Sequence, residues 1–173
     1  SPEKHQLAEN QACNCHDEAW GRLVGTFYYG ARSLWWMSER QQKRYLERYP
    51  DLETRSQSVL SSVFSEEFWV QLRSLREKYA DVKRNGWLVL GSTSWIKGTD
   101  AALQWCKDEG KDYKILQGLK PERILEEMAQ AEGFVYLPQG GDTCPRMVIE
   151  AKLLGCKLQL NDNVEHKDEI WFN

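Results

Sequence analysis

The sequence predicts an α/β fold, a Rossmann-like parallel sheet with helices on both faces. Two observations carry this prediction. From Gly86 onward, four short apolar runs alternate with three segments whose apolar residues recur with a helical period. The runs are too short for helices and rich in β-favouring residues, and most of them end at glycine or proline. Such alternation is typical of βαβ units, in which helices cover both faces of parallel strands.

Before Gly86 the pattern is looser. The polar segment 1–17 has no period, and we interpret it as a loose leader or the cut edge of something larger. Ser38, with Gln41 three positions later, forms a possible capping box for a helix that Pro50 terminates. The expected elements are a helix over 19–29, a strand over 33–38, a helix through Glu47, a strand over 58–64 and a helix over 65–83.

After Gly86 each element is bounded by recognisable signals. Pro121 suits the first turn of one helix and Pro145 that of another, because a missing N–H costs little there. The expected strands are 87–90, 113–116, 134–137 and 157–160, and the expected helices are 99–108, 121–132 and one that follows Pro145.

Composition describes an ordinary globular chain. Its 173 residues are 41% hydrophobic and 28% charged, and they suit one domain, or one domain with a piece of another. The formal net charge is −3, so the overall field gives no reason to expect nucleic-acid binding. Eight tryptophans are more than usual, and we assign most of them to packing.

The five cysteines are an odd number without a regular framework. No signal peptide or membrane-spanning apolar run accompanies them, so we expect a reducing cytoplasm. Cys13, Cys15 and His16 bring three soft ligands together, but no partner cluster follows later in the chain. Incidental thiols in a near-terminal segment are the simpler interpretation.

The chain is organised around the stretch 137–155, where a strand, a glycine turn and a helix follow one another. Gly140 and Gly141 mark the turn. Backbone N–H groups at the helix start would form a seat for phosphate or a sugar hydroxyl. Asp142 lies at the mouth of this helix and Glu150 about two turns inside it. The alternative is that Asp142 only caps the helix and Glu150 only faces water.

Ligands of parallel α/β sheets bind outside the carboxyl ends of the strands. The candidate segments are therefore 92–98, 117–120, 139–143 and 161–163. No Gly-x-Gly-x-x-Gly follows the strand after Gly86, no Walker A pattern exists, and no nucleophile–base–orienter triad can be built. A basic cluster, Arg40, Lys43, Arg44 and Arg48, has mostly helical spacing and reads as a solvated face or, alternatively, a phosphate site.

These residues resemble a known family. Lys97-Gly98 after a glycine loop, Leu137-Pro138 before an acid-x7-acid element, and Glu150-Ala151 resemble the donor-binding domain of retaining GT-B glycosyltransferases, group 1 (family 4). The strand leading to 158–163 is similar as well. The match covers 86–170 best; more loosely, 31–64 resembles the end of such an enzyme's N-terminal domain.

The resemblance implies roles for particular residues. Lys97 would neutralise the donor diphosphate, Glu150 would accept hydrogen bonds from the ribose, and Asp142 would hold the transferred sugar or the phosphate beside it. The surrounding donor site would comprise Ser92, Gly98, Gln117, Gly140, Gly141, Thr143 and Arg146. The donor would be a UDP-, GDP- or ADP-sugar, and neither a metal nor another cofactor is required.

The chain departs from the family at several positions. Ser92 stands where a diphosphate-binding arginine is usual, Asp142 replaces a glutamate, and Cys144-Pro145 replaces Phe-Gly. Arg146 is the candidate for the missing cation, with a solvated helix residue as the alternative. Residues 1–85 are then a leader, a remnant of the N-terminal domain and a linker helix, and 86–173 the nucleotide-sugar-binding domain.

Three functions follow from this comparison. The first is sugar transfer with retention to an unknown acceptor, with the missing acceptor domain supplied by a partner chain or a homo-oligomer. The second is a non-catalytic nucleotide-binding or subunit-interaction module that has lost turnover. The third, a sugar-nucleotide epimerase, would need an acid and a base, for which the sequence offers at most His166.

Overall fold

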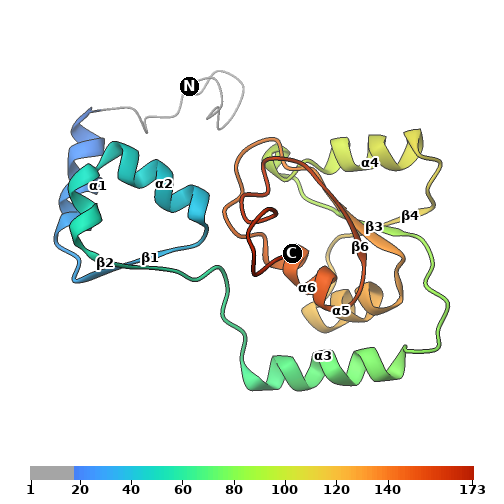
Figure 1. Ribbon diagram of the computed structural model, residues 1–173. Coiled ribbons are helices and arrows are strands. Elements are labelled where there is room, and N and C mark those ends of the chain that lie inside the picture. The colour runs from blue at the N-terminus through green and yellow to red at the C-terminus, as the bar shows by residue number, and fades with distance from the viewer. Residues whose placement is uncertain (1–17) are drawn as a thin grey trace. The chain divides into compact units, whose positions relative to one another are not determined.

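The computed structural model describes residues 18–173, which belong to two compact units, 18–61 and 62–173 (Figure 1). The segment 1–17, with Cys13, Cys15 and His16, lies outside the described residues. The sequence grouped the linker helix with the first segment, up to residue 85. In the structure this helix, α3 (Glu66–Lys78), buries Leu72 and Leu75 in the core of the second unit, which begins at Ser62.

The first unit contains two strands and two α-helices. Its elements are α1 (Glu18–Tyr29), β1 (Ser33–Trp36), α2 (Glu39–Arg48), a 3-10 helix, η3 (Pro50–Thr54), and β2 (Ser56–Val59). The strands are parallel, with Ser33 opposite Ser56. Alternate residues of β1 point to opposite faces, so Leu34 and Trp36 are buried while Trp35 is 70% exposed.

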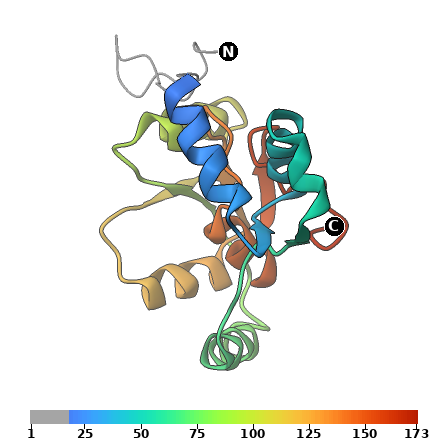
Figure 2. The ribbon, with the colours of Figure 1, turned by 90° about the vertical axis from the view of Figure 1, so that its left-hand side faces the viewer.

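An aromatic cluster holds the first unit together. Trp36 packs against Tyr28 of α1 and Tyr45 of α2, which places both helices on one face of the short sheet, as Figure 2 also shows. The predicted cap of α2 is confirmed, because the Ser38 hydroxyl accepts a hydrogen bond from the Gln41 amide at 2.9 Å. The Gln41 side chain in turn accepts one from the Met37 amide.

Several expected elements end earlier than predicted, two of them by five residues. The strand expected over 58–64 is β2, which ends at Val59. Its partner β1 stops at Trp36 because Ser38 caps α2, so the residues after Leu60 have no strand beside them. The helix expected over 65–83 ends at Lys78, since its apolar stripe ends at Tyr79.

The second unit is built on a four-stranded parallel sheet in the order β4-β3-β5-β6. The strands are β3 (Trp87–Leu90), β4 (Tyr113–Leu116), β5 (Gly133–Tyr136) and β6 (Lys157–Leu160). The helices between them are η4 (Trp95–Lys97), α4 (Thr99–Asp108), α5 (Pro121–Gln130) and α6 (Arg146–Leu153). The mixed α/β class with a parallel sheet, predicted from the sequence, is confirmed.

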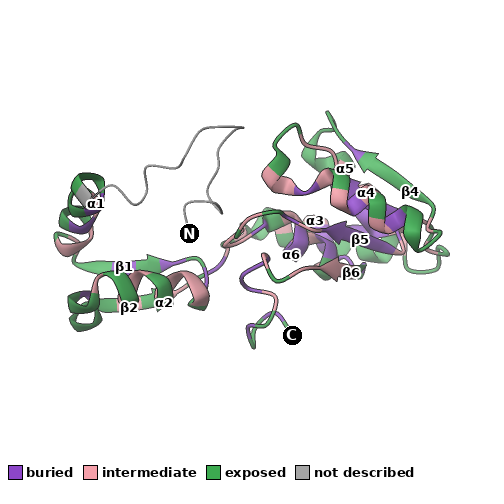
Figure 3. Ribbon diagram, turned by 90° about the horizontal axis from the view of Figure 1, so that it is seen from above, coloured by how far each residue is buried: buried purple, intermediate pink, exposed green. Residues whose placement is uncertain are grey.

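Side chains of alternate strand residues form a core on each face of the sheet. On one face, Trp87, Val89 and Val135 pack under α4 through Ala102 and Cys106. On the other, Leu88, Phe134 and Tyr136 pack under α5, α6 and α3. β5 is buried along its whole length, whereas β4 lies at the edge and is mostly exposed (Figure 3). Helices therefore cover both faces, with β5 at the centre.

Arg84 ties together the ends of two helices in the second unit. Its guanidinium donates hydrogen bonds to the carbonyl oxygens of Ala131, at 3.1 Å, and Leu154, at 2.6 Å. A third, longer one reaches Met128. These carbonyls lie at the carboxyl ends of α5 and α6, where backbone acceptors lack helical partners and a positive charge is favoured.

Replacing Arg84 should therefore destabilise the second unit. Arg84→Ala leaves these carbonyls without their donor, and we expect a loss of roughly 2 kcal/mol in the free energy of unfolding. Denaturant unfolding measures the change. Lys83→Ala is the control, because Lys83 is an exposed neighbour of the same charge. Equal stability of the two variants would contradict this role for Arg84.

Candidate functional site

The order of the strands creates a switch point in the second unit. The chain passes from β3 to β4 on one side and then returns to β5 on the other side of β3. Loops leaving β3 and β5 therefore diverge at the carboxyl edge, which is where open α/β sheets bind ligands. The β3 loop carries residues 91–98 and the β5 loop carries residues 137–145.

Gly98 brings these two loops into contact. Its φ is +67°, and a β-carbon at this position would overlap the carbonyl oxygen of Leu137. The Gln139 amide donates to the Ile96 carbonyl at 2.8 Å, which joins the loops a second time. Thr99 then anchors the start of α4 by donating its hydroxyl to the Leu90 carbonyl at 2.8 Å. At position 98, only glycine allows both the positive φ and the close approach of the Leu137 carbonyl.

Lys97 and Asp142 meet across this contact. The Lys97 ammonium lies 2.8 Å from Oδ2 of Asp142, and the Tyr136 hydroxyl donates to the same oxygen at 2.5 Å. The side chain of Lys97 is 40% exposed and that of Asp142 15%. Burial, then the hydrogen bond to Asp142, raises the pKa of Tyr136 above its usual value, so its hydroxyl stays a donor. The pair is thus formed by two residues that the sequence assigned to the site.

Asp142 is also held from behind by the segment after β6. Its amide donates to the Asn163 carbonyl at 2.7 Å and its carbonyl accepts from the Glu165 amide at 3.0 Å, which makes a parallel bridge to Val164. The side-chain amides of Asn161 and Asn163 both donate to the carbonyl of Pro138. Four hydrogen bonds therefore position this loop.

Glu150 forms a different pair, with Arg146 one turn earlier in α6. The two side chains are 2.7 Å apart, and the Glu150 side chain is only 12% exposed. Burial raises the pKa of Glu150 although Arg146 opposes the shift. The Arg146 guanidinium lies 4.8 Å over the ring of Phe64 and 5.2 Å over that of Phe68, so aromatic faces hold it in place.

A pocket of about 410 Å³ opens beside this second pair. Helix α5 contributes Pro121, Glu122 and Leu125 to its walls, α3 contributes Phe68, and α6 contributes Arg146 and Glu150. Its size suits a small ligand, and its walls combine apolar surface with a few polar groups. Lys97 does not line this pocket. The structure thus shows two ion pairs, one at each end of the segment 142–150.

The other predicted site residues surround the first pair or the edge of the sheet. The Ser92 amide donates to the Thr99 hydroxyl at 3.1 Å, and Gln117 is exposed just after β4. Gly140 lies near Ile96, Gly141 is exposed, and Thr143 is partly buried beside His166. Neither Gly140 nor Gly141 has a positive φ, so the turn does not require their special conformation.

The alternative roles of Asp142 and Glu150 are wrong. The N-cap of α6 is Pro145, which forms no side-chain cap, and Asp142 instead joins the bridge to Val164. Glu150 does not face water. The glycine turn also does not lead straight into α6, because residues 142–145 intervene, with an isolated bridge at Asp142 and a bend at Thr143. The tertiary bridge satisfies the backbone of Asp142 in place of the helix end.

The sequence missed Tyr136 as a site residue, whereas Asn161 and Asn163 lie in the candidate segment 161–163 that follows a strand end. It also missed the surroundings of His166. This ring is fully buried and stacks on Trp171 at 5.3 Å. Burial lowers its pKa, while the Thr143 backbone and then the charges of Glu169, Asp142 and Glu165 oppose the shift.

Among residues 18–173 no group of three His, Cys, Asp or Glu side chains could hold a metal ion. The helices of the same range include none with the length and apolarity to cross a membrane. Comparison of the chain with known protein families, curated proteins and solved structures found no match. The function is therefore inferred from the geometry of the site and from the sequence pattern.

Gly98 allows a test of the loop contact. We expect Gly98→Ala to lower the free energy of unfolding by more than about 3 kcal/mol, because strain at positive φ adds to the overlap with Leu137. Gly110→Ala is the matched control. Its φ is +58° and no atom lies within 4 Å of the added carbon, so it should lose only about 1–2 kcal/mol. Equal losses in calorimetric unfolding would refute the contact.

His166 makes stability depend on pH. Its folded-state pKa lies below the unfolded value, so below a pH of about 6.5 the unfolded chain binds more protons. The second unit should therefore lose stability as pH falls from 7.5 to 5.5. His166→Phe, whose ring suits the neighbouring Trp171 and Phe172, should lose less over the same range. Parallel curves of melting temperature against pH for both proteins would exclude this role.

Proposed function

We propose that residues 62–173 bind a nucleotide-diphospho-sugar and that the chain is a retaining glycosyltransferase or a domain of one. The meeting of Lys97 and Asp142 at the switch point, 2.8 Å apart, is the observation that carries the proposal. It places a cation and a carboxylate from separate loops at the edge where such sheets bind nucleotides. The resemblance to the GT-B donor domain supplies the choice of ligand.

The two ion pairs suggest how the site changes when a donor binds. Each cation already faces a carboxylate, so a diphosphate competes with Asp142 for Lys97 and with Glu150 for Arg146. Released from Arg146, the Glu150 carboxylate accepts hydrogen bonds from ribose hydroxyls, and the adjacent pocket of about 410 Å³ receives the nucleoside. Asp142 keeps its bond from Tyr136 and turns its free oxygen to the sugar.

In the proposed reaction the bond between the anomeric carbon and the phosphate oxygen breaks. An acceptor hydroxyl attacks the same face of the sugar, and its proton moves to the leaving phosphate oxygen. Charge develops on that diphosphate, and Lys97 stabilises it without covalent chemistry. This differs from the glycosidase mechanism, so Asp142 and Glu150 need not act as an acid and base pair. The acceptor would come from another domain, a partner chain or a second copy.

A second candidate is a nucleotide-binding or subunit-interaction module without turnover. The observation that favours it is the neutralisation of both cations by their neighbours, which leaves little net positive charge for a leaving diphosphate. Release of nucleoside diphosphate from UDP-, GDP- or ADP-sugars distinguishes the two. Turnover supports the transferase, whereas binding without release, with or without candidate partners, supports the module.

Nucleoside diphosphates should stabilise the second unit. With UDP, GDP and ADP tested separately, one of them at a hundred times its Kd should add about 2.7 kcal/mol to the free energy of unfolding. Lys97→Ala should weaken that binding roughly tenfold or more, because a charged hydrogen bond is lost. Asp142→Asn should not weaken it, since Lys97 then has no competing carboxylate, but should weaken the preference for the sugar-bearing donor.

Lys107→Ala is the control for charge, because Lys107 is exposed on α4 away from the loops. Thermal shift and isothermal titration calorimetry measure both effects. The absence of a shift with all three nucleotides at millimolar concentration would count against the donor site. A Lys97→Ala protein that binds as tightly as its parent would remove Lys97 from it.

A further inference from the structure

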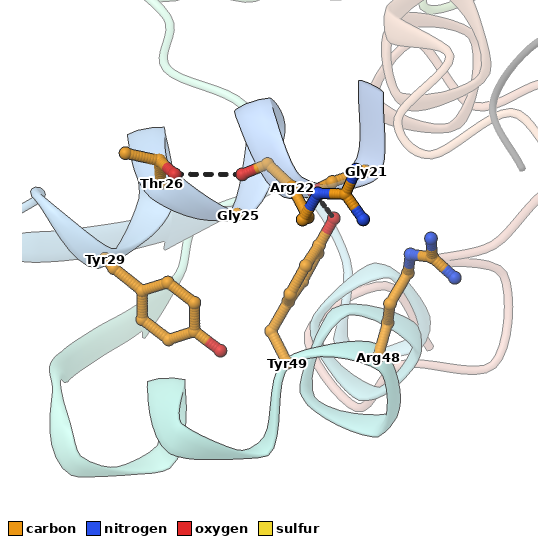
Figure 4. Close-up of a pocket in the computed structure, with 7 residues that line it drawn as sticks. All are labelled: Gly21, Arg22, Gly25, Thr26, Tyr29, Arg48 and Tyr49. Atoms are coloured by element: carbon orange, nitrogen blue, oxygen red, sulfur yellow. Dashed lines mark hydrogen bonds between the residues drawn. The ribbon is translucent and has the colours of Figure 1, made fainter. Parts of the chain in front are cut away.

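A groove in the first unit runs between α1 and the carboxyl end of α2 (Figure 4). Its larger part is a pocket of about 540 Å³, lined mainly by Gly21, Arg22, Gly25 and Tyr29 of α1 and by Arg48 and Tyr49. Figure 4 shows both guanidinium groups at the same end of this pocket. A smaller pocket of about 260 Å³ shares Arg48 and Tyr49 and adds Arg44 and Trp20.

Two glycines allow the close approach that forms this groove. A β-carbon at Gly21 would lie 2.6 Å from a guanidinium nitrogen of Arg48, and one at Gly25 would lie 2.9 Å from the Tyr49 ring. The Tyr49 hydroxyl donates to the Gly21 carbonyl at 2.8 Å. The side chains of Arg48 and Tyr49 therefore lie directly against the backbone of α1.

Basic side chains line the groove, although the whole chain carries −3. Three arginines, Arg22, Arg44 and Arg48, line the two pockets, and no acidic residue does. Within residues 18–173 no carboxylate pairs with Arg48, whose guanidinium lies 5.8 Å over the Tyr49 ring. The planar fork of arginine matches the oxygens of phosphate.

We propose that this groove is a second binding site, for a ligand that carries a phosphate monoester. Arg22 and Arg48 hold the phosphate at one end of the larger pocket, and the Tyr29 ring packs against the remainder of the ligand. The volume suits a small organic phosphate. The site lies wholly in the first unit and does not rest on the function proposed for the second.

The phosphate could come from a soluble metabolite or from a lipid head group. Trp20, Leu23 and Phe27 form an exposed stripe on the same helix as Arg22, with Phe27 81% exposed. Such a stripe next to arginines suits the interface of an anionic bilayer. The two sources share one chemistry, and the experiment separates them.

The full chain with Lys97→Ala is the starting protein, so that the second unit does not dominate phosphate binding. Glucose 1-phosphate, with glucose as the neutral control, is titrated by calorimetry. Vesicles of phosphatidylcholine with and without phosphatidic acid are tested by co-sedimentation. Arg48→Gln is the test variant. Arg32→Gln is its control, because Arg32 is an exposed arginine of the same unit that lines neither pocket.

Arg48→Gln should weaken binding at least about tenfold, and Arg32→Gln should leave it unchanged. Circular dichroism checks that both variants fold, and Arg22→Gln provides a second route to the same loss. Binding of glucose 1-phosphate but not glucose supports the site with a soluble source. Sedimentation only with phosphatidic acid vesicles supports it with a lipid source. Binding to neither probe, or equal effects of Arg48→Gln and Arg32→Gln, would overturn the proposal.

Discussion

The approach of two backbone loops at Gly98 is the constraint on which the candidate site depends. A side chain there would overlap the Leu137 carbonyl, so any other residue would push the β3 loop away from the β5 loop. Lys97 precedes this glycine directly and would move with it, and its pairing with Asp142 requires the loops to touch. One residue without a side chain thus sets the distance between two charged ones.

The electrostatic design of the site follows from that contact. Lys97 pairs with the carboxylate of Asp142, and Arg146 pairs with that of Glu150. Both carboxylates belong to the segment 142–150. Partly buried charges are retained because they are paired, since an isolated carboxylate would be costly there. An incoming anion must exchange partners with these carboxylates. The affinity of this site for an anion therefore depends on how much more strongly each cation binds the anion than its own carboxylate. Ligands that differ in this respect can be discriminated.

The two units differ in how helices cover their sheets. In the second unit, helices cover both faces of the sheet and β5 is buried from end to end. In the first, both helices lie on one face of a two-stranded sheet, and Trp35 remains exposed on the other. Parallel strands are rarely left with a bare face. The exposed Trp35 therefore marks that face of the short sheet as surface available for other molecules.

Local pattern by itself determined much of this protein. The bounds of α4 and β4 agree with the prediction, because capping signals and short apolar runs act over a few neighbours. Ser38 was recognised as a cap for the same reason. The same reasoning placed Lys97 and Asp142 among the candidates because they follow strand ends, whereas Glu150 was singled out by its place about two turns inside a helix and by the family resemblance.

Only the tertiary structure decided how those residues are paired. Asp142 looked like a helix cap, yet it joins Val164 and Lys97, which lie 22 positions later and 45 earlier in the chain. The strand expected over 58–64 stopped at Val59 because its neighbour ended, which depends on a partner and not on its own composition. Strand order sets which loops share an edge, and that order comes from packing between distant segments.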